Sequence, residues 1–381
     1  MDDPLLFQFQ LPTKVRFGFG VSAALGEEAA ALGRRALVVT DPGVLRAGIA
    51  DGPLAALRDA GLTVALFHGV SGNPRDHECL AAAEAGRALG ADMVVAVGGG
   101  SPMDTAKTAA ALLANGGTPQ DWEAPARLDR PPLPVVAVPT TSGTGSEVTF
   151  YAVVTDTARH VKMSLFDPRL APAVALVDPG LTMTLPAAVT ASTGMDALTH
   201  AVEAATCRLA NPVSDALAKE AIGLVARHLP TAVRDGANRE ARAGTMMGSL
   251  LAGMAFGNTD VGSVHCLAEA IGGRYDTPHG VANAVFLPLV LAHNAAAFPE
   301  RHAAVAVALG LGGESAADAV AAVAALAREV GIPRLRDLPG VDPADFPALA
   351  EAAKRNVSDP SNCREMQVAD YLRLLRQAWE A

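Results

Sequence analysis

Short, continuously hydrophobic runs alternate with helical patterns in the first half of the chain. Five runs rich in valine and alanine have the length of buried strands: Ala36–Thr40, Thr63–His68, Met93–Val97, Val135–Val138 and Val174–Val177. Strands that are apolar on both faces are typical of a parallel sheet covered by helices on each side. Segments with helical spacing lie between them, for example Pro53–Ala60, His77–Leu89 and Pro102–Leu113. The alternation predicts a parallel, doubly wound α/β sheet.

After Pro179 the strand-like runs stop and helical spacing takes over. The helical segments are Ala187–Cys207, Val213–His228, Arg239–Ala255, Ser263–Ile271, Gly280–Ala296, Ala316–Val330, Pro347–Lys354 and Gln367–Glu380. An alanine-rich stretch over 303–329 also has helical spacing. We therefore expect an α/β domain over residues 1–182 and an all-α domain over residues 183–381. The boundary near Pro179–Pro186 is short, which favours two domains that share a cleft.

Composition and charge exclude several classes of protein. Half of the 381 residues are hydrophobic and only 18% are charged, which excludes a disordered chain. The net charge of −10 argues against a nucleic-acid partner or an anionic membrane surface. The four cysteines form no CxxC pair, the acidic start Met1–Pro4 has no apolar signal region, and no apolar run reaches the length of a membrane span. These features predict a soluble cytoplasmic protein.

A glycine-rich turn follows the third predicted strand. Gly98-Gly99-Gly100-Ser101 stands where a strand passes into a helix, with Ser101 as the expected N-cap, Pro102 as the first helical residue and Asp104 as a capping-box partner. Glycines here let a ligand approach the backbone, and the helix start favours an anion such as pyrophosphate. The sequence is neither GxGxxG nor a Walker A motif, so a tight, well-capped turn explains it equally well.

A second loop strengthens the phosphate interpretation. Pro139–Glu147 (PTTSGTGSE) follows the next strand with five hydroxyl side chains and two glycines. Ligands of open α/β sheets sit beyond the carboxyl ends of the strands, so the two loops together predict a dinucleotide site. Asp41, at the end of the first predicted strand, would bind ribose hydroxyls and repel a 2′-phosphate, favouring NAD over NADP. The alternative for Asp41 is an ordinary turn aspartate before Pro42-Gly43.

Four polar residues of the helical half have the types and spacing of metal ligands. Asp196 and His200 are four residues apart on one helix face, His265 lies on a second helix, and His279 starts a third. One carboxylate and three imidazoles suit Fe²⁺ or Zn²⁺ with a position open to substrate. A surface Asp–His hydrogen bond and a buried core histidine are the alternatives. The apolar neighbours indicate burial, and buried charge needs a partner or a metal.

Taken together, these segments resemble the iron-containing (group III) alcohol dehydrogenase family. The motifs are Gly98–Lys107 (GGGSPMDTAK), Pro139–Thr149, Thr193–His200 and Pro278–Val285 (PHGVANAV), and they occur in the family's order along nearly the whole chain. The resemblance implies a nucleotide-binding α/β domain and a helical metal-binding domain, the architecture shared with dehydroquinate synthase.

The resemblance also implies which residues bind which group. By position, the family's metal ligands fall on Asp196, His200, His265 and His279. The expected cofactor contacts, including the loop glycines, are Asp41, Asn73, Gly98, Gly99, Gly100, Ser101, Thr140, Thr141, Thr144 and Lys162. Many members carry a further histidine, discussed as a proton relay, four residues after the third ligand. Glu269 stands there instead, and it either acts as the base, shapes the pocket or adds a ligand; we leave it outside the metal set.

The expected activity is reversible hydride transfer between NAD(H) and a small primary alcohol or its aldehyde. The expected metal is Fe²⁺, or alternatively Zn²⁺. The enzyme is expected to be a homo-oligomer of two or more chains. Phe150, Phe256 and Cys363 are candidates for the pocket lining. The alternatives are a maleylacetate reductase-like or glycerol dehydrogenase-like enzyme. A dehydroquinate synthase-like lyase is a weaker alternative, because it handles a phosphorylated, carboxylated substrate and would need more basic residues near the ligands than Arg274 and Arg208. A non-catalytic nucleotide-binding protein is a further alternative, but it would not need all four candidate metal ligands.

Overall fold

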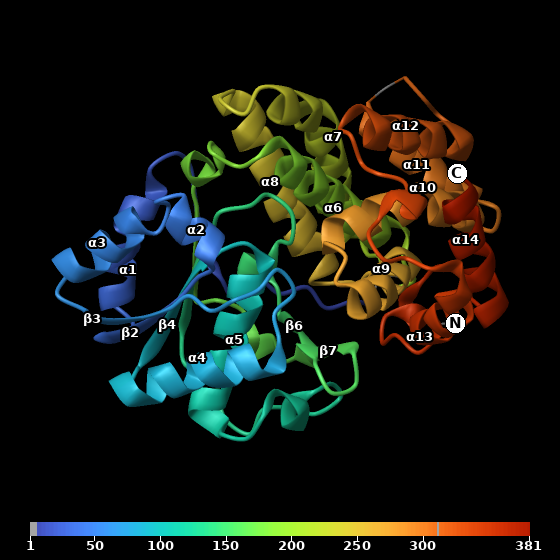
Figure 1. Cartoon of the computed structure of the whole chain (residues 1–381). Coiled ribbons are helices and arrows are strands. Elements are labelled where there is room, and N and C mark those ends of the chain that lie inside the picture. The colour runs from blue at the N-terminus through green and yellow to red at the C-terminus, as the bar shows by residue number, and fades with distance from the viewer. Residues whose placement is uncertain (1–5, 311) are drawn as a thin grey trace. The chain divides into compact units, whose positions relative to one another are not determined.

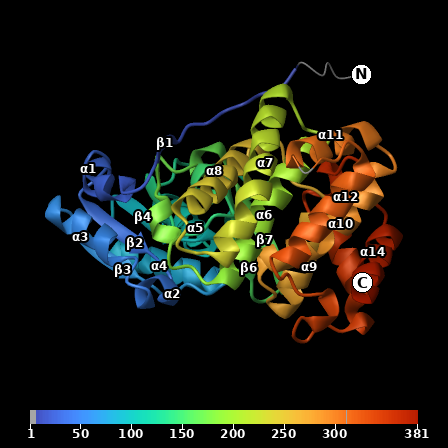
Figure 2. The same cartoon turned by 90° about the horizontal axis from the view of Figure 1, so that it is seen from above.

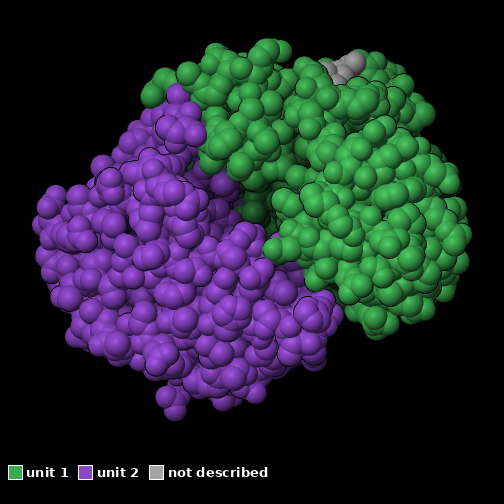
Figure 3. Space-filling view, viewed as in Figure 1, with its two compact units in different colours: residues 1–10, 142–144, 185–381 green, residues 11–141, 145–184 purple. Residues whose placement is uncertain are grey.

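The computed structural model describes residues 6–310 and 312–381. These residues form two compact units, coloured separately in Figure 3. Of the described residues, 11–141 and 145–184 form the sheet unit, and 6–10, 142–144, 185–310 and 312–381 form the helical unit. The chain thus crosses from one unit into the other near residue 184 and also on either side of the loop 142–144. The predicted ranges, 1–182 for dinucleotide binding and 183–381 for metal binding, stay a prediction.

The sheet unit is built on six parallel strands (Figure 1). Their spatial order is β1 (Lys14–Phe17), β8 (Val174–Val177), β5 (Val135–Pro139), β4 (Met93–Gly98), β2 (Arg35–Val39) and β3 (Thr63–Phe67). The five predicted strands are confirmed, each within one residue at either end. The sequence analysis missed β1, because its residues are charged or only half-buried at the edge of the sheet.

Helices cover both faces of this sheet, and β4 shows why its residues are all apolar. Val94 and Ala96 point into the core formed with α4 (Asp76–Leu89) and α5 (Gly100–Asn115). Met93, Val95 and Val97 point into the opposite core, formed with α1 (Leu25–Ala30) and α3 (Asp51–Asp59). In a strand that is buried on both faces, every side chain points into an apolar core, so its hydrophobic run is continuous. The predicted doubly wound arrangement is confirmed.

Two details of the sheet unit differ from expectation. A two-stranded antiparallel hairpin, β6 (Tyr151–Asp156) and β7 (Val161–Phe166), follows the second loop and was not predicted. Its residues alternate between buried and half-buried, a weaker signal than a continuous apolar run. The predicted cap of α5 is wrong, because the helix already begins at Gly100 and Gly99 precedes it. The Ser101 hydroxyl donates to the carbonyl of Gly72 at 2.8 Å instead.

The carboxylate expected to complete that cap is used elsewhere. Asp104 accepts from the Ser146 hydroxyl at 2.8 Å and from the Val153 amide at 3.0 Å. Asp104 therefore ties α5 to the segment that leads into the hairpin, and the helix start keeps no side-chain cap. Such tertiary bonds cannot be seen in the local sequence, where the same residues fit a capping box.

In its described residues 185–310 and 312–381, the helical unit contains helices joined by loops and short 3-10 turns, and no strand (Figures 1 and 2). They are α6 (Ala187–Thr206), α7 (Pro212–Arg234), α8 (Arg239–Phe256), α9 (Ser263–Tyr275), α10 (His279–Ala295), α11 (Pro299–Leu309), α12 (Ala316–Glu329), α13 (Phe346–Lys354) and α14 (Val368–Glu380). The eight predicted helices are confirmed, and the alanine-rich stretch divides into α11 and α12. The central helix α6 packs on α7, α8 and α10 around one large apolar core.

None of the helices in the described part of the chain has both the length and the apolar character needed to cross a lipid bilayer.

Close packing at the β4–α5 turn gives a first prediction. A Cβ atom on Gly98 would lie 2.5 Å from Cγ of Pro102, which the helix holds in place. Gly98→Ala is therefore expected to lower the free energy of unfolding by about 1–3 kcal/mol. Gly52→Ala in α3 is the control, because nothing lies within 4 Å of its added Cβ, and it should be neutral or slightly stabilising. Urea titration of both variants measures the difference, and equal stabilities would contradict the packing.

Candidate metal and cofactor sites

One carboxylate and three imidazoles converge inside the helical unit. Asp196, His200, His265 and His279 each offer a ligand atom, and these atoms all lie within 4.8 Å of one another. The rings of His200 and His265 have centroids 4.6 Å apart, and those of His265 and His279 are 5.2 Å apart. The first three residues are buried and His279 is half-buried. Sequence reasoning therefore selected residues that the fold brings together from three helices.

Two glycines allow close contacts with α6 beside the cluster. A Cβ atom on Gly280 would lie 2.3 Å from the carbonyl oxygen of Ser192, so the start of α10 touches α6 directly and places His279 beside Asp196. Gly143 lies against Thr193 in the same way, because its Cβ atom would be 2.8 Å from that residue's Cβ. The Gly143 carbonyl consequently lies 3.3 Å from Nδ1 of His200. Gly143 and Gly280 are thus required for packing around the cluster.

The electrostatics of the cluster favour a bound cation. Asp196 is only 2% exposed, and its ion-pair partner among the described residues is His279 Nε2 at 3.8 Å, not a lysine or an arginine. The amide nitrogen of Asn283 lies 2.6 Å from Asp196 Oδ1 and 3.1 Å from Nε2 of both His265 and His279. One carboxylate oxygen and two imidazole nitrogens thus surround the single neutral NH₂ group of Asn283. Buried acceptors of this kind fit a divalent metal ion, whose bonds to nitrogen and oxygen are roughly 2 Å long.

Two of the histidines have opposite pKa shifts. Burial lowers the pKa of His200 to about 4, so its imidazole is neutral at pH 7. Burial also acts to lower the pKa of His265, but the hydrogen bond from its Nδ1 to Glu203 Oε2, at 2.6 Å, and the nearby carboxylates outweigh it. The pKa of His265 therefore lies above its ordinary value.

The candidate cofactor residues of the sheet unit gather at the carboxyl edge of the sheet. From β2 the chain proceeds outward to β3, whereas from β4 it proceeds to β5 on the other side. The carboxyl ends of β2 and β4 therefore mark the point where the strand order reverses, and open α/β sheets bind nucleotides there. Asp41 follows β2, and the glycine-rich turn Gly98–Ser101 closes β4 and opens α5. Sequence reasoning did not identify this switch point, because it requires the strand order.

Direct contacts connect most of these residues. Gly98 pairs with Pro139, and the Thr140 amide donates to the Gly98 carbonyl at 2.9 Å. A Cβ atom on Gly99 would lie 3.0 Å from the Thr141 hydroxyl. Lys162 donates to Oδ1 of Asn73 at 2.9 Å, and the adjacent Gly72 accepts from Ser101. Thr144 lies in the part of its loop that belongs to the helical unit.

Asp41 has a structural task as well as a candidate functional one. Its Oδ1 accepts from the amides of Gly43 at 2.7 Å and Val44 at 2.9 Å and caps the short helix α2 (Pro42–Arg46). The structure thus contains the turn aspartate that the sequence offered as an alternative.

Other candidates lie in the helical unit. The ring of Phe256 stacks on His200 with centroids 4.2 Å apart, so it forms an apolar surface beside the cluster. Glu269, one turn after His265 on α9, accepts from the Asn356 amide at 2.6 Å and is not part of the four-residue cluster. Cys363 is buried, and burial raises its pKa to about 11, which leaves an unreactive thiol. Phe150 is buried in the sheet unit.

Two family models match this chain in succession. The model described as "Iron-containing alcohol dehydrogenase" matches residues 12–179, and the one described as "Fe-containing alcohol dehydrogenase family, C-terminal" matches residues 190–379. The chain belongs to the iron-containing alcohol dehydrogenase family. The family predicted from the motifs is therefore confirmed.

Several relatives in the family match this chain over nearly their whole length. The 1,3-propanediol dehydrogenase of Klebsiella pneumoniae is 43% identical, covering 98% of this chain and 99% of the relative. The NAD-dependent methanol dehydrogenase of Bacillus methanolicus is 38% identical, covering 97% and 99%. The crystal structure of a 1,3-propanediol oxidoreductase has a TM-score of 0.94 at 43% identity, covering 98% of this chain and 100% of that chain.

At the level of the family, these matches confirm several predictions: the fold class, an oxidoreductase that acts between NAD(H) and an alcohol or aldehyde, and the use of iron together with NAD.

Two polar residues of the metal cluster's surroundings escaped the sequence analysis. Glu203 contacts His265, and Asn283 contacts Asp196, His265 and His279. A signal was present for both. Glu203 continues the spacing of Asp196 and His200 along one face of α6, and Asn283 lies one helical turn after His279.

The opposite pKa shifts predict distinct titrations in metal-free enzyme. His200 should stay neutral down to about pH 4, because burial opposes its charge. His265 should stay protonated above pH 6.5, because its pKa is raised by Glu203. The His265–Glu203 pair therefore stabilises the metal-free fold fully below about pH 6.5, and this contribution is lost as the pH rises through the folded-state pKa of His265. NMR of histidine-labelled protein measures both values, and a His265 pKa below 6.5 would contradict the assignment.

Proposed function

We propose that this chain catalyses the reversible reaction RCH₂OH + NAD⁺ ⇌ RCHO + NADH + H⁺ on small primary alcohols, with a divalent iron held by Asp196, His200, His265 and His279. The observation that carries the proposal is the convergence of these four ligand atoms within 4.8 Å in a buried part of the helical unit. Zn²⁺ accepts the same ligands, so the choice of iron rests on the family.

The proposed mechanism assigns separate tasks to the two sets of residues. When bound, the metal supplies Lewis acidity that lowers the pKa of the substrate hydroxyl, and NAD supplies the hydride acceptor. The four ligands hold the ion, and Phe256 beside His200 keeps one side of the site apolar. The backbone amides at the uncapped start of α5 hold the pyrophosphate, because an uncapped helix N-terminus attracts anions.

The proposed cofactor contacts are Asp41, Asn73, Gly98, Gly99, Gly100, Ser101, Thr140, Thr141, Thr144 and Lys162. The position of Asp41 and of Gly98–Ser101 at the strand-order reversal supports the dinucleotide site. The cation of Lys162, held beside Asn73, supports an anionic ligand at the same edge. A carboxylate at Asp41 favours NAD over NADP by repelling the 2′-phosphate.

Glu269 is proposed as the group that accepts the hydroxyl proton. Its carboxylate is half-buried, is oriented by Asn356, and stands one helical turn from His265. A carboxylate held in this way is a suitable general base at neutral pH. Glu269 therefore takes the position where many family members carry the relay histidine.

We choose C1–C4 alcohols and 1,3-propanediol as the first substrates to test, because two similar relatives are named for 1,3-propanediol and methanol. The lyase alternative is disfavoured by its need for basic side chains near the ligands. Arg274 is paired with Asp345 at 3.0 Å, and Arg208 donates to the Asn362 carbonyl at 2.8 Å.

A cytoplasmic location and a homo-oligomeric state are part of the same proposal. The location is supported by Cys79, Cys207, Cys266 and Cys363, which are all free and buried, as is common in reducing compartments. The oligomer, a dimer or larger, rests on the resemblance to the family.

Loss of one ligand tests the metal site. His265→Ala should remove tightly bound iron and lower kcat/KM at least about 1,000-fold, because the Lewis acid contributes several kcal/mol. NAD affinity should change less than about threefold. His77→Ala is the control, since this surface histidine on α4 lies outside the cluster. Iron analysis, NAD titration and kinetics are measured on both variants, and an active, iron-free His265→Ala enzyme would sink the proposal.

Loss of charge at Asp41 tests cofactor preference. Asp41→Ser keeps an oxygen able to cap α2 but removes the charge, so it separates the structural task from the electrostatic one. The ratio of kcat/KM for NADP to that for NAD should rise about tenfold or more, because like-charge repulsion costs at least about 1.4 kcal/mol. Asp51→Ser, in the first turn of α3, is the matched control. An unchanged ratio would show that Asp41 only caps the helix.

A further inference from the structure

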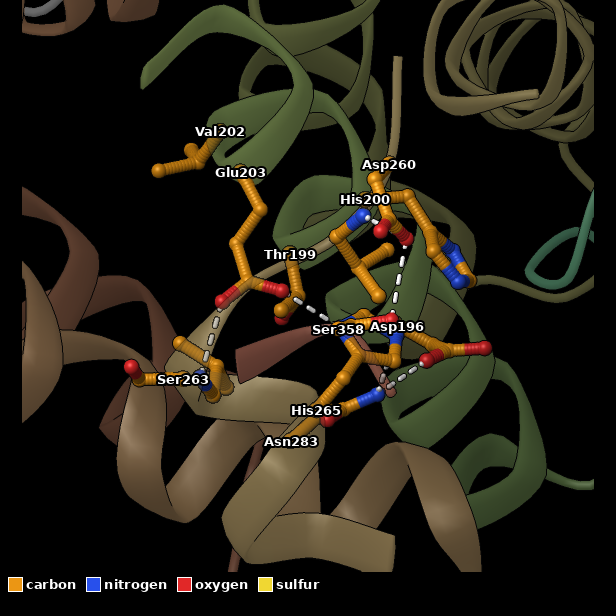
Figure 4. A network of polar contacts seen from close by, with 12 residues as sticks. Asp196, Thr199, His200, Val202, Glu203, Asp260, Ser263, His265, Asn283 and Ser358 are labelled. Atoms are coloured by element: carbon orange, nitrogen blue, oxygen red, sulfur yellow. Dashed lines mark hydrogen bonds and ion pairs between the residues drawn. The ribbon is translucent and has the colours of Figure 1, made fainter. Parts of the chain in front are cut away.

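Glu203 is a buried carboxylate beside the metal cluster that neither ligand binding nor proton transfer has accounted for. It is 5% exposed, and both of its oxygens accept hydrogen bonds (Figure 4). Oε1 accepts from the backbone amide of Val264 at 2.8 Å, and Oε2 lies 2.6 Å from Nδ1 of His265. Glu203 thus contacts the one cluster histidine on α9 while lying on α6 itself.

We propose that Glu203 is a positioning residue for the metal site, which holds His265 in the tautomer with hydrogen on Nδ1 and directs the Nε2 lone pair into the cluster. This inference rests on the proposed metal site. A neutral imidazole carries one N–H, so a hydrogen bond from Nδ1 to a carboxylate leaves Nε2 as the acceptor. Metal-binding histidines commonly donate their other N–H in this way.

The orientation of the His265 ring supports this assignment. Its Nε2 lies 3.1 Å from the Asn283 amide nitrogen, which also contacts Asp196 and His279. Nε2 therefore faces the other ligands, while Nδ1 faces Glu203. The opposite tautomer would direct an N–H toward the place where a cation must bind and would leave a lone pair against a carboxylate.

Glu203 is itself held in place from two sides. Its Oε1 is bound to the first turn of α9, the helix that carries His265. A Cβ atom on Gly262 would lie only 3.0 Å from that oxygen, so the absent side chain gives Glu203 its room. Asp196, His200 and Glu203 follow one another at intervals of four and three residues on one face of α6. One helix face thus supplies two ligands and the support of a third.

Charge balance gives Glu203 a second effect on the ion. A divalent cation with Asp196 as its one anionic ligand leaves a net positive charge in a buried site. The Glu203 carboxylate, one imidazole away, compensates that charge, and burying a compensated site costs less than burying a charged one. Glu203 should therefore strengthen metal binding without touching the metal.

Glu203→Gln is the sharpest substitution for testing this role. Glutamine has nearly the same shape, but an NH₂ donor replaces one of its two oxygens. Because Val264 and His265 contact different oxygens of Glu203, the glutamine can accept from only one of them in this geometry. Asp260→Asn is the matched control, because that carboxylate accepts from the hydroxyls of Ser358 at 2.9 Å and Ser361 at 2.6 Å and from no histidine. The control removes a comparable carboxylate from the same unit without altering a ligand.

The experiment measures Zn²⁺ affinity of the full-length, metal-free enzymes by competition with a chromophoric chelator. Glu203→Gln should bind Zn²⁺ about 10–100-fold more weakly than wild type, and Asp260→Asn should stay within about threefold. In the presence of chelator, the melting temperature of Glu203→Gln should lie within a few degrees of that of wild type. Zn²⁺ affinity of Glu203→Gln equal to that of wild type would overturn the role of Glu203 while leaving the metal site intact. Failure of wild type itself to bind Zn²⁺ would overturn the metal site as well.

A spectroscopic measurement on wild type keeps the test decisive if Glu203→Gln does not fold. Long-range ¹⁵N–¹H correlation of histidine-labelled, metal-free enzyme, at a pH where His265 is neutral, reports which ring nitrogen carries the hydrogen. The expected result is hydrogen on Nδ1 of His265. Hydrogen on Nε2 would overturn the proposal.

Discussion

The convergence of one buried carboxylate and three imidazoles on a common point is the constraint on which the helical unit depends. Asp196 is almost wholly buried, and no lysine or arginine in the described residues pairs with it. An uncompensated charge on so deeply buried a carboxylate would be costly. A divalent cation resolves this conflict, because it pairs with the carboxylate and accepts the imidazole lone pairs. The close helix contacts at Gly143 and Gly280 are the packing that this arrangement requires.

In the sheet unit, the proposed pyrophosphate contact is made by backbone amides, whereas charged side chains such as Lys162 and Asp41 flank it in the same proposal. The proposed site lies where the strand order reverses between β2 and β4, and the turn at Gly98 is so close to Pro102 that a side chain does not fit. The same absence of side chains that permits the packing also exposes backbone amides at the start of α5, where an anion is favoured. The close packing at Gly98 and the proposed binding of an anion by the backbone amides therefore both depend on the absence of side chains in this turn.

Much of the fold could be predicted because its signals are local. The strand Met93–Val97 is a continuous apolar run, and Ala187–Cys207 has clear helical spacing, so both were placed to within one residue. What escaped depends on tertiary contacts or weak patterns. The edge strand β1 and the hairpin β6–β7 are only partly buried. Asp104 accepts hydrogen bonds from Ser146 and Val153 and does not form the capping box that the local sequence suggests. The cluster was found because spacing on one helix and the family motifs selected the same residues. Glu203 and Asn283 were missed because their contacts with the cluster depend on how the helices pack, although both lie at helical spacing from a candidate ligand.

The most direct test of the central claim is X-ray absorption spectroscopy of the purified enzyme after reconstitution with Fe²⁺. The account predicts one iron per chain, with a first shell of nitrogen and oxygen near 2.0–2.2 Å and the outer-shell scattering of about three imidazole rings. A protein that retains no stoichiometric metal, or an iron without imidazole scattering, would contradict the account at its foundation.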